Sequence, residues 1–474
     1  MPRLLDDDAM GGPASRSPSC IVLAGCAPIS FRYFVLPFAA SLARNGSLDC
    51  AVELHVIGAD RWIAGEAEAL RAAVSSLPIA CRELSGLRTE SGLTGDGVFT
   101  LFASAHFFQL PALLRRYRVP VLALDLDSLV EGPLDALVAK DTEADVVLTA
   151  GSGSDDWNRI APSPLLVRPT APGIAFAELV ARYIAHFLRK GIAPRQLDQI
   201  ALSAACRNEQ DRGGAARIVQ RAADEWPLSP GLSRQSEAMR LQLCAPYLPR
   251  LRRVCDWILP GCDTFFHTQL PYSRILLGRP TWAGSVLEAC LAQTAGRRRA
   301  LDIGAHIGFW SRWLAAHFEH VDAFEPHALL RECLHANVDA ANLTVHGCAL
   351  GDRNGAVAIN LGAENTGTSH VVESASGEVP LRRLDEFAFI DVDFIKIDVE
   401  GYELFVLRGS VATLRRNLPL VLVEQNESNE RYGISPLAAV SFLEALGARV
   451  VGRPSKVDYL LGWESPDSWR EAAS

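Results

Sequence analysis

The sequence predicts an α/β protein with two domains, and three observations support this prediction. The chain has 474 residues, whereas a single domain usually holds about 100 to 150. In each half, short apolar runs of strand length alternate with stretches of helical periodicity, which is typical of parallel sheets flanked by helices. Acidic residues and glycines recur where the predicted strands end, and this is the edge at which such sheets bind ligands.

The composition narrows the class of protein. Hydrophobic residues at 49% and charged residues at 21% are ordinary for a globular chain. The net charge of −9 gives no electrostatic support to nonspecific nucleic-acid binding. The eleven cysteines form no Cys-x-x-Cys motif, which indicates a reducing compartment, and we expect a cytoplasmic protein. Residues 1–19 predict a disordered lead that lacks the basic region of a signal peptide.

A first domain is predicted over residues 20–205. Its opening apolar stretch, residues 20–43, resembles a membrane span, but Arg32 lies near its middle, with Pro28 and Pro37 on either side. A central arginine costs about 2.5 to 3.5 kcal/mol in a membrane, so we expect a buried strand followed by a helix. Strands are predicted at residues 20–24, 51–57, 120–124 and 146–149, and helices at 34–44, 62–75, 134–139 and 196–205.

Two aspartates follow the third of these strands. Asp125 and Asp127 both can face one ion, and paired carboxylates at a strand end suit Mn²⁺ or Mg²⁺ carrying a diphosphate. The spacing alone is weak, because Asp391 and Asp393 repeat it in a setting that suggests no metal. The apolar strand before Asp125 and the turn and helix after Asp127 make the first pair the better candidate.

Over about residues 18–210, this arrangement resembles the GT-A nucleotide-sugar glycosyltransferases. The resemblance implies that Asp125 and Asp127 hold the metal and the nucleotide-sugar diphosphate, and that Asp198 lies near the acceptor or donor sugar. The chain departs from the family at residues 25–28, where an acidic residue is common, and at residues 160–166. It also shows no convincing histidine as a third metal ligand. The alternative is a domain that has lost catalysis and serves as a glycan-binding or scaffolding module.

A less regular region follows the first domain. The charged stretch 207–225 precedes Pro227, Pro230 and Gly231, so a linker is predicted over residues 206–245. Residues 257–263 come before the first strand of the second domain, and we expect them to contribute to its lid.

Four strands predicted in the second domain each end in acidic residues. The strands are expected at residues 300–303, 321–324, 394–399 and 419–423, with helices from residue 309 and over 403–416. The acids are Asp302, Glu325, Asp398 with Glu400, and Glu424. Because parallel strands place their carboxyl ends at one edge, these acids should share one crevice.

The loop after the first of these strands indicates the kind of cofactor. Gly304 allows a sharp turn, and Gly308 lets a ligand or the next helix approach closely. Glu325 lies 23 residues after Asp302, the distance at which an acid binds ribose hydroxyls. A dinucleotide site requires Gly-x-Gly-x-x-Gly, whereas this chain has Asp-x-Gly-x-x-x-Gly, so a cofactor without a pyrophosphate fits better than NAD. We expect S-adenosylmethionine.

The second domain is predicted over residues 246–465, and about residues 250–465 resemble the FkbM family of class I (Rossmann-like) methyltransferases. The resemblance rests on motifs at residues 301–309, 324–326, 337, 349–352, 384–385 and 395–401. It implies S-adenosylmethionine-dependent O-methylation, commonly of a sugar or polyketide hydroxyl. It also implies that Asp302, Gly304 and Gly308 hold the methionine part and Glu325 the ribose, with His306 in the same loop. Ala349 and Asp352 would lie beside the adenine, and residues 398–401 would face the transferring methyl group.

Methyl transfer to a hydroxyl requires alignment of the oxygen and removal of one proton. Glu400, beside Asp398, is the first candidate for the base, followed by Glu424, His306 and His370. Alternatively, Glu400 forms an ion pair with Lys396. The two domains together predict an enzyme of surface-glycan or glycoconjugate assembly that methylates a saccharide and also transfers a sugar. The alternative keeps only the methyltransferase as an enzyme.

Overall fold

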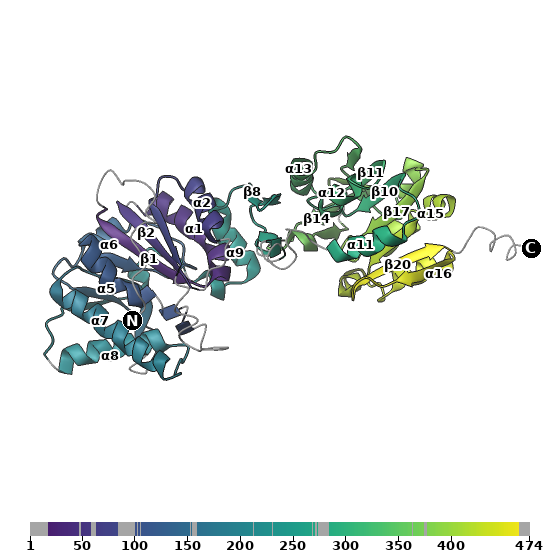
Figure 1. Ribbon diagram of the computed structural model, residues 1–474. Helices are drawn as coiled ribbons and strands as arrows, with labels where there is room; N and C mark the ends of the chain where they lie inside the picture. The colour runs from purple at the N-terminus through teal and green to yellow at the C-terminus, as the bar shows by residue number, and fades with distance from the viewer. Residues whose placement is uncertain are drawn as a thin grey trace, which may run out of the picture. The chain divides into compact units, whose positions relative to one another are not determined.

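The computed structural model divides the chain into two compact units, Met1–Leu248 and Pro249–Ser474 (Figure 1). It describes residues 18–463 except 47–48, 58–62, 84–99, 102, 105, 152, 154–158, 212, 230, 268, 271–272, 274–283, 363 and 374–376. The predicted lead therefore lies almost entirely outside the described residues. Within them, no helix combines the length and the apolar character needed to cross a membrane.

The first unit is built on a seven-stranded mixed sheet with the order β3-β2-β1-β4-β6-β5-β7. Strand β1 pairs in parallel with β2 and β4, and β6 runs antiparallel to β4 and β5. All four predicted strands are present. The strands are β1 Cys20–Cys26, β2 Cys50–Val56, β3 Ile79–Glu83, β4 Val121–Ala123, β5 Val146–Ala150, β6 Ile160–Val167 and β7 Ile218–Arg221.

Helices cover both faces of this sheet, as the alternation of side chains in β1 requires. Val22 packs in one core with Phe38 of α1, whereas Leu23 packs in the other with Phe107 of α5. The predicted strand and helix at residues 20–43 are thus confirmed, and Arg32 pairs with Glu66 at 2.8 Å. The helices are α1 Pro28–Asn45, α2 Ile63–Ala73, α5 His106–Tyr117, α6 Asp135–Ala139, α7 Ala171–Arg189, α8 Leu197–Asp211 and α9 Glu237–Cys244.

The linker predicted at residues 206–245 is wrong, because this segment is folded into the first unit. Helix α8 continues to Asp211, β7 pairs in parallel with β5, and α9 follows. Trp226 and Leu232 are buried. Strand β7 lies at the edge of the sheet, where charged residues are tolerated. The same charged composition is also typical of an exposed linker, so composition alone could not distinguish the two.

The second unit contains a seven-stranded sheet with the order β12-β11-β10-β17-β18-β20-β19. The strands from β12 to β18 are parallel, and β20 is antiparallel to β18 and β19. The four strands predicted from the sequence stand next to one another as β11, β10, β17 and β18. The bounds are β10 Arg299–Ile303, β11 His320–Phe324, β12 Leu343–His346, β17 Val392–Ile397, β18 Leu420–Glu424, β19 Ala448–Gly452 and β20 Asp458–Trp463.

The helix predicted over residues 403–416 is interrupted. A β-carbon on Gly409 would lie 1.9 Å from the Gly351 carbonyl oxygen, so the chain packs too closely there for a side chain. The helix divides at this point into α14 and α15. The helices of this unit are α11 Gly284–Gln293, α12 Phe309–Ala315, α13 Ala328–Asn337, α14 Glu403–Arg408, α15 Val411–Asn417 and α16 Ala438–Ala445.

Two smaller pieces complete the second unit beside the main sheet. A hairpin of β8 Leu251–Val254 and β9 Trp257–Pro260 is tied to α13 through Asn337, whose amide exchanges hydrogen bonds with both backbone groups of Ile258. The other piece is a four-stranded sheet of β13 Ala349–Leu350, β14 Gly355–Asn360, β15 His370–Val372 and β16 Val379–Arg382.

Candidate active site

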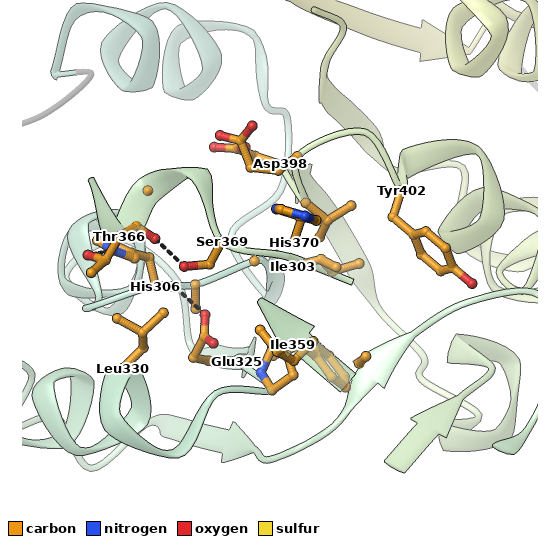
Figure 2. Close-up of a pocket in the computed structure, with 18 of the residues that line it drawn as sticks. Ile303, His306, Glu325, Leu330, Ile359, Thr366, Ser369, His370, Asp398 and Tyr402 are labelled. Carbon is orange, nitrogen blue, oxygen red and sulfur yellow. Dashed lines mark hydrogen bonds between the residues drawn. The ribbon is translucent and has the colours of Figure 1, made fainter. Parts of the chain in front are cut away.

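A cavity opens in the second unit at the carboxyl ends of β10, β11, β17 and β18 (Figure 2). The small sheet and residues 265–266 supply further walls. The cavity is lined by four of the acids at strand ends, Glu325, Asp398, Glu400 and Glu424. Gly304, His306, Ala349 and His370 also line it, whereas Asp302, Gly308 and Asp352 do not.

The two glycines of the loop after β10 have different roles. Gly304 has φ +81°, and a β-carbon there would lie 1.8 Å from the Asp398 carbonyl oxygen. Gly308, at the start of α12, has φ +95°, and its β-carbon would lie 2.8 Å from a methyl carbon of Val338. Gly304 thus brings the loop against the end of β17. Gly308 makes room for the neighbouring residues after α13, not for a ligand.

Asp302 is buried beneath the loop and makes internal contacts. Its Oδ2 accepts a hydrogen bond of 2.6 Å from Ser311, and its Oδ1 lies 3.4 Å from Lys396 Nζ. This geometry does not favour the predicted contact between Asp302 and a methionine group. Asp302 instead helps to hold Lys396 at the floor of the site.

The alternative in which Lys396 forms an ion pair with Glu400 is wrong, because the partners of Lys396 are Gly304, Asp302 and Asp398. The ammonium group donates to the Gly304 carbonyl oxygen at 2.6 Å and lies 3.6 Å from Asp398 Oδ2. Burial opposes its charge, but Asp398 and Asp302 outweigh burial and raise the pKa of Lys396. The residue is therefore a buried cation that joins β10, β17 and the glycine loop.

Glu325, just after β11, is fixed by two backbone donors. The N–H of His327 donates to Oε1 at 2.8 Å, and that of His306 donates to Oε2 at 2.9 Å (Figure 2). Burial raises its pKa to about 7, although these donors, Lys396 and Arg331 lower it. The carboxylate keeps acceptor capacity toward the cavity, which suits a pair of ribose hydroxyls.

Three carboxylates meet at the ends of β17 and β18. One oxygen of each of Asp398, Glu400 and Glu424 lies within 4.8 Å of the others, close enough to hold a cation. Ser428 donates to Glu400 Oε2 at 3.1 Å. Burial and then Asp398 raise the pKa of Glu400 to about 7. Asp398, followed by burial, raises the pKa of Glu424 much further, so Glu424 is the protonated member at neutral pH.

The structure adds two residues that sequence reasoning did not single out for the site. Thr366 Oγ1 lies 2.8 Å from His306 Nε2, and the buried Asp263 accepts hydrogen bonds from Thr366. Residues 257–263 were expected in a lid, and Asp263 does contact the wall of the cavity. The 103-residue separation between Asp263 and Thr366 left no local signal of their contact.

The other predicted residues of this site lie at its side or on the surface. His370 hydrogen-bonds the Thr368 carbonyl oxygen through Nδ1 at 3.0 Å. Ala349 is buried in the wall. Asp352 Oδ1 lies 3.4 Å from Nη1 of the exposed Arg353, and Asp352 does not line the cavity, so the geometry does not favour it beside an adenine.

The acids of the first unit gather after β4. The backbone N–H of Asp125 donates to Ser163 Oγ at 2.8 Å, and Asp127 Oδ2 accepts from the Ser233 N–H at 3.2 Å. The surrounding protein, then Asp127 and Asp198, raise the pKa of Asp125 to about 7, although solvent reaches its side chain. Burial raises that of Asp198 to about 6. In the part of the chain that the structure describes, these three do not form a group as tight as that around Glu400.

Comparison with known proteins gives one family-model match, which lies within the second unit. Residues 302–450 match the family model described as the methyltransferase FkbM domain. No curated protein gave a significant match.

Solved structures that resemble the chain at low identity include one methyltransferase and two glycosyltransferases. One is an FkbM methyltransferase from Methylobacillus flagellatus KT, at 16% identity, covering 94% of this chain and 90% of its own, with a TM-score of 0.27. Another is the glycosyltransferase GlyE from Streptococcus pneumoniae TIGR4, at 12% identity, 70% and 80% coverage and a TM-score of 0.34. The galactosyltransferase LgtC, with donor and acceptor sugar analogs, is similar at 15% identity, 42% and 72% coverage and a TM-score of 0.30. Residues 302–450, inside the second unit, thus match the methyltransferase FkbM domain.

Proposed function

We propose that the second unit is an S-adenosylmethionine-dependent O-methyltransferase that acts on a hydroxyl of a saccharide or glycoconjugate. The observation that carries this proposal is the cavity in which Glu325 and the group of Asp398, Glu400 and Glu424 lie together inside the family domain. Glu325 supplies acceptors for hydroxyl donors at one side, and the carboxylate group supplies negative charge at the other.

The residues present fit this cofactor. The cavity wall near Glu325 includes the apolar side chains of Ile303, Leu330 and Leu350, which suit an adenine ring. Among the described residues, Lys396 is the one cationic side chain in the lining, against four carboxyl groups of which only Glu424 is protonated by its neighbour Asp398. A sulfonium cation would therefore meet a favourable potential, and when bound it supplies the methyl group to be transferred.

Glu400 is the proposed base. Its pKa of about 7 lies near working pH, as efficient proton transfer requires, and it lines the cavity. Ser428 fixes one oxygen of Glu400, which leaves the other to accept the hydroxyl proton. Protonated Glu424 can donate a hydrogen bond within the group, so that neighbouring carboxyl groups have separate acid and base roles.

The test is methyl transfer from radiolabelled S-adenosylmethionine to a panel of saccharides by the full chain. We expect Glu400→Gln to lower kcat by about 10² to 10⁴-fold while cofactor affinity changes little. Glu427→Gln is a matched control, because Glu427 is exposed on the neighbouring segment. A parent protein that binds no S-adenosylmethionine in calorimetry would overturn the proposal.

For the first unit we propose a GT-A-like domain that uses Mn²⁺ or Mg²⁺ and a nucleotide sugar. The supporting observation is that Asp125, Asp127 and Asp198 interact electrostatically at the end of β4, where a cation would relieve their repulsion. Nucleotide-sugar hydrolysis in Mn²⁺ should be lost in Asp125→Asn and kept in the surface control Asp211→Asn. Glycan binding without hydrolysis in either metal would favour the binding-module alternative.

A further inference from the structure

Asp263 lies outside the family domain at residues 302–450, yet it is connected to the cavity. Its side chain is fully buried. Oδ1 accepts the Phe266 N–H at 2.7 Å, and Oδ2 accepts both the N–H of Thr366 at 2.9 Å and the Thr366 hydroxyl. Burial raises the pKa of Asp263, whereas the three donors that converge on its carboxyl group, and Arg252, lower it. With the carboxyl group ionised, both of its oxygens can only accept. The Thr366 proton is therefore directed at Asp263.

This direction fixes the next hydrogen bond. A hydroxyl has one proton, so Thr366 Oγ1 can only accept from its other partner, His306 Nε2, at 2.8 Å. Nε2 must then carry the ring proton, and Nδ1 carries the lone pair. The tautomer of His306 follows from the hydrogen-bond network alone.

The ring is also held in place by its surroundings. Phe266 and Phe309 pack against it with ring centroids 5.2 and 5.9 Å away. The backbone of His306 has φ +54°, in the left-handed region, and its N–H donates to Glu325. Burial, assisted by Lys396, lowers its pKa to about 3, so the ring stays neutral at physiological pH.

The lone-pair nitrogen is available to a ligand. Among the described residues, none forms a hydrogen bond with His306 Nδ1. This nitrogen is also absent from the fully buried, unpaired side-chain atoms, so it is not sealed off inside the protein. His306 lines the cavity beside Glu325 (Figure 2). A fixed acceptor thus stands next to the carboxylate to which we assign the ribose.

We propose that Asp263 and Thr366 are positioning residues that lock His306 as the Nε2–H tautomer, so that Nδ1 accepts a hydrogen bond from an ammonium or hydroxyl donor of the cofactor. This rests on the proposed function for the identity of the ligand. It assigns the segment before the family domain a part in cofactor recognition.

The tautomer can be read in the free protein by two-bond proton–nitrogen correlation spectra of the histidine rings, where protonated and lone-pair nitrogens resonate in separate regions. His306→Asn identifies the signals. We expect a lone pair at Nδ1 in the parent and in Thr366→Ser, and a mixture of tautomers in Thr366→Val. A protonated Nδ1 in the parent would overturn the proposed hydrogen-bond chain from Asp263 through Thr366 to His306, whether or not any cofactor binds.

The ligand contact is tested by adding S-adenosylhomocysteine or 5′-methylthioadenosine, which lacks the amino-acid part. A shift of the Nδ1 signal with the first alone assigns the ammonium, and a shift with both assigns a nucleoside donor. We expect Thr366→Val to weaken S-adenosylhomocysteine binding by about five-fold, and Thr366→Ser to restore it. Saturation by both ligands with no Nδ1 shift would refute the contact. If neither ligand binds, the proposed function itself is refuted, while the tautomer result stands.

Discussion

Cofactor binding should become tighter as pH rises from 6 to 8, because Glu325 must ionise to accept two hydroxyl donors. Its pKa is about 7 in the free protein. The ionised fraction is then about one in eleven at pH 6 and about ten in eleven at pH 8. If the ionised form alone binds well, the Kd for S-adenosylmethionine falls about ten-fold over this interval, which corresponds to about 1.4 kcal/mol.

The direction of the Glu325 pKa shift also determines how the stability of the fold depends on pH. The raised pKa of Glu325 means that its contribution to folding is fully present below the unfolded value near 4.5 and is lost as pH rises through about 7. A cofactor that favours the ionised form restores this loss. The increase in Tm caused by S-adenosylmethionine should therefore be larger at pH 8 than at pH 6.

Isothermal calorimetry in buffers of low and high ionisation enthalpy measures the Kd and the number of protons released on binding. At pH 7 we expect release of about half a proton per cofactor bound. Glu325→Gln should remove the pH dependence of the Kd and the proton release. It should also weaken binding by about 10 to 100-fold, because a charge-assisted hydrogen bond is lost. Any titration of the ligand's own amino group is common to both proteins and is subtracted.

Glu400 has a similar pKa and provides the decisive control. Glu400→Gln should retain most of the pH dependence of cofactor binding, because we assign Glu400 to the acceptor hydroxyl. A Kd that is constant between pH 6 and 8 in the parent would refute the assignment of Glu325 to the ribose. So would a slope that persists in Glu325→Gln and disappears in Glu400→Gln.

Two further predictions concern the floor of the site. Lys396→Met leaves Asp302 and Asp398 without their buried cation, so the free energy of unfolding of the full chain in urea should fall by about 3 to 5 kcal/mol. The double variant Lys396→Met/Asp302→Asn should recover part of this loss, and a loss below about 1 kcal/mol in the single variant would contradict this role. Gly304→Ala introduces a β-carbon 1.8 Å from the Asp398 carbonyl oxygen at positive φ, so cofactor binding should fall at least 100-fold, whereas Gly355→Ala, with no atom within 4 Å of the new β-carbon, should change nothing measurable.

Much of the second unit was predictable because its signals are local. The apolar runs that became β10, β11, β17 and β18 have strand length, and each ends in an acid or a glycine. Parallel pairing then brings those ends to one edge without any knowledge of side-chain contacts. The convergence of Glu325, Glu400 and Glu424 on one cavity follows from this rule.

The errors come from contacts between distant segments. The sequence of β17 shows Lys396 between apolar neighbours but not that Asp302, on the adjacent strand, lies within 3.4 Å. Glycines give a second example: Gly308 was compatible with a ligand or a helix, and only the position of Val338 decides between them. Charge composition misled at residues 206–245, because an edge strand tolerates the same residues as a linker.

The number of acids at the strand ends overstates the charge that the cavity presents. Asp302 is compensated by Lys396 and Ser311 beneath the floor. Glu424 is protonated because Asp398 lies beside it. Near neutral pH the negative charge that faces a ligand therefore depends on two titrating groups, Glu325 and Glu400. A cation entering the cavity should lower the pKa of Glu400 and so ionise the proposed base when the methyl donor arrives. The pH profile of kcat should accordingly have its acid limb below pH 7, and a limb that remains at or above 7 with cofactor saturating would argue against Glu400 as the base.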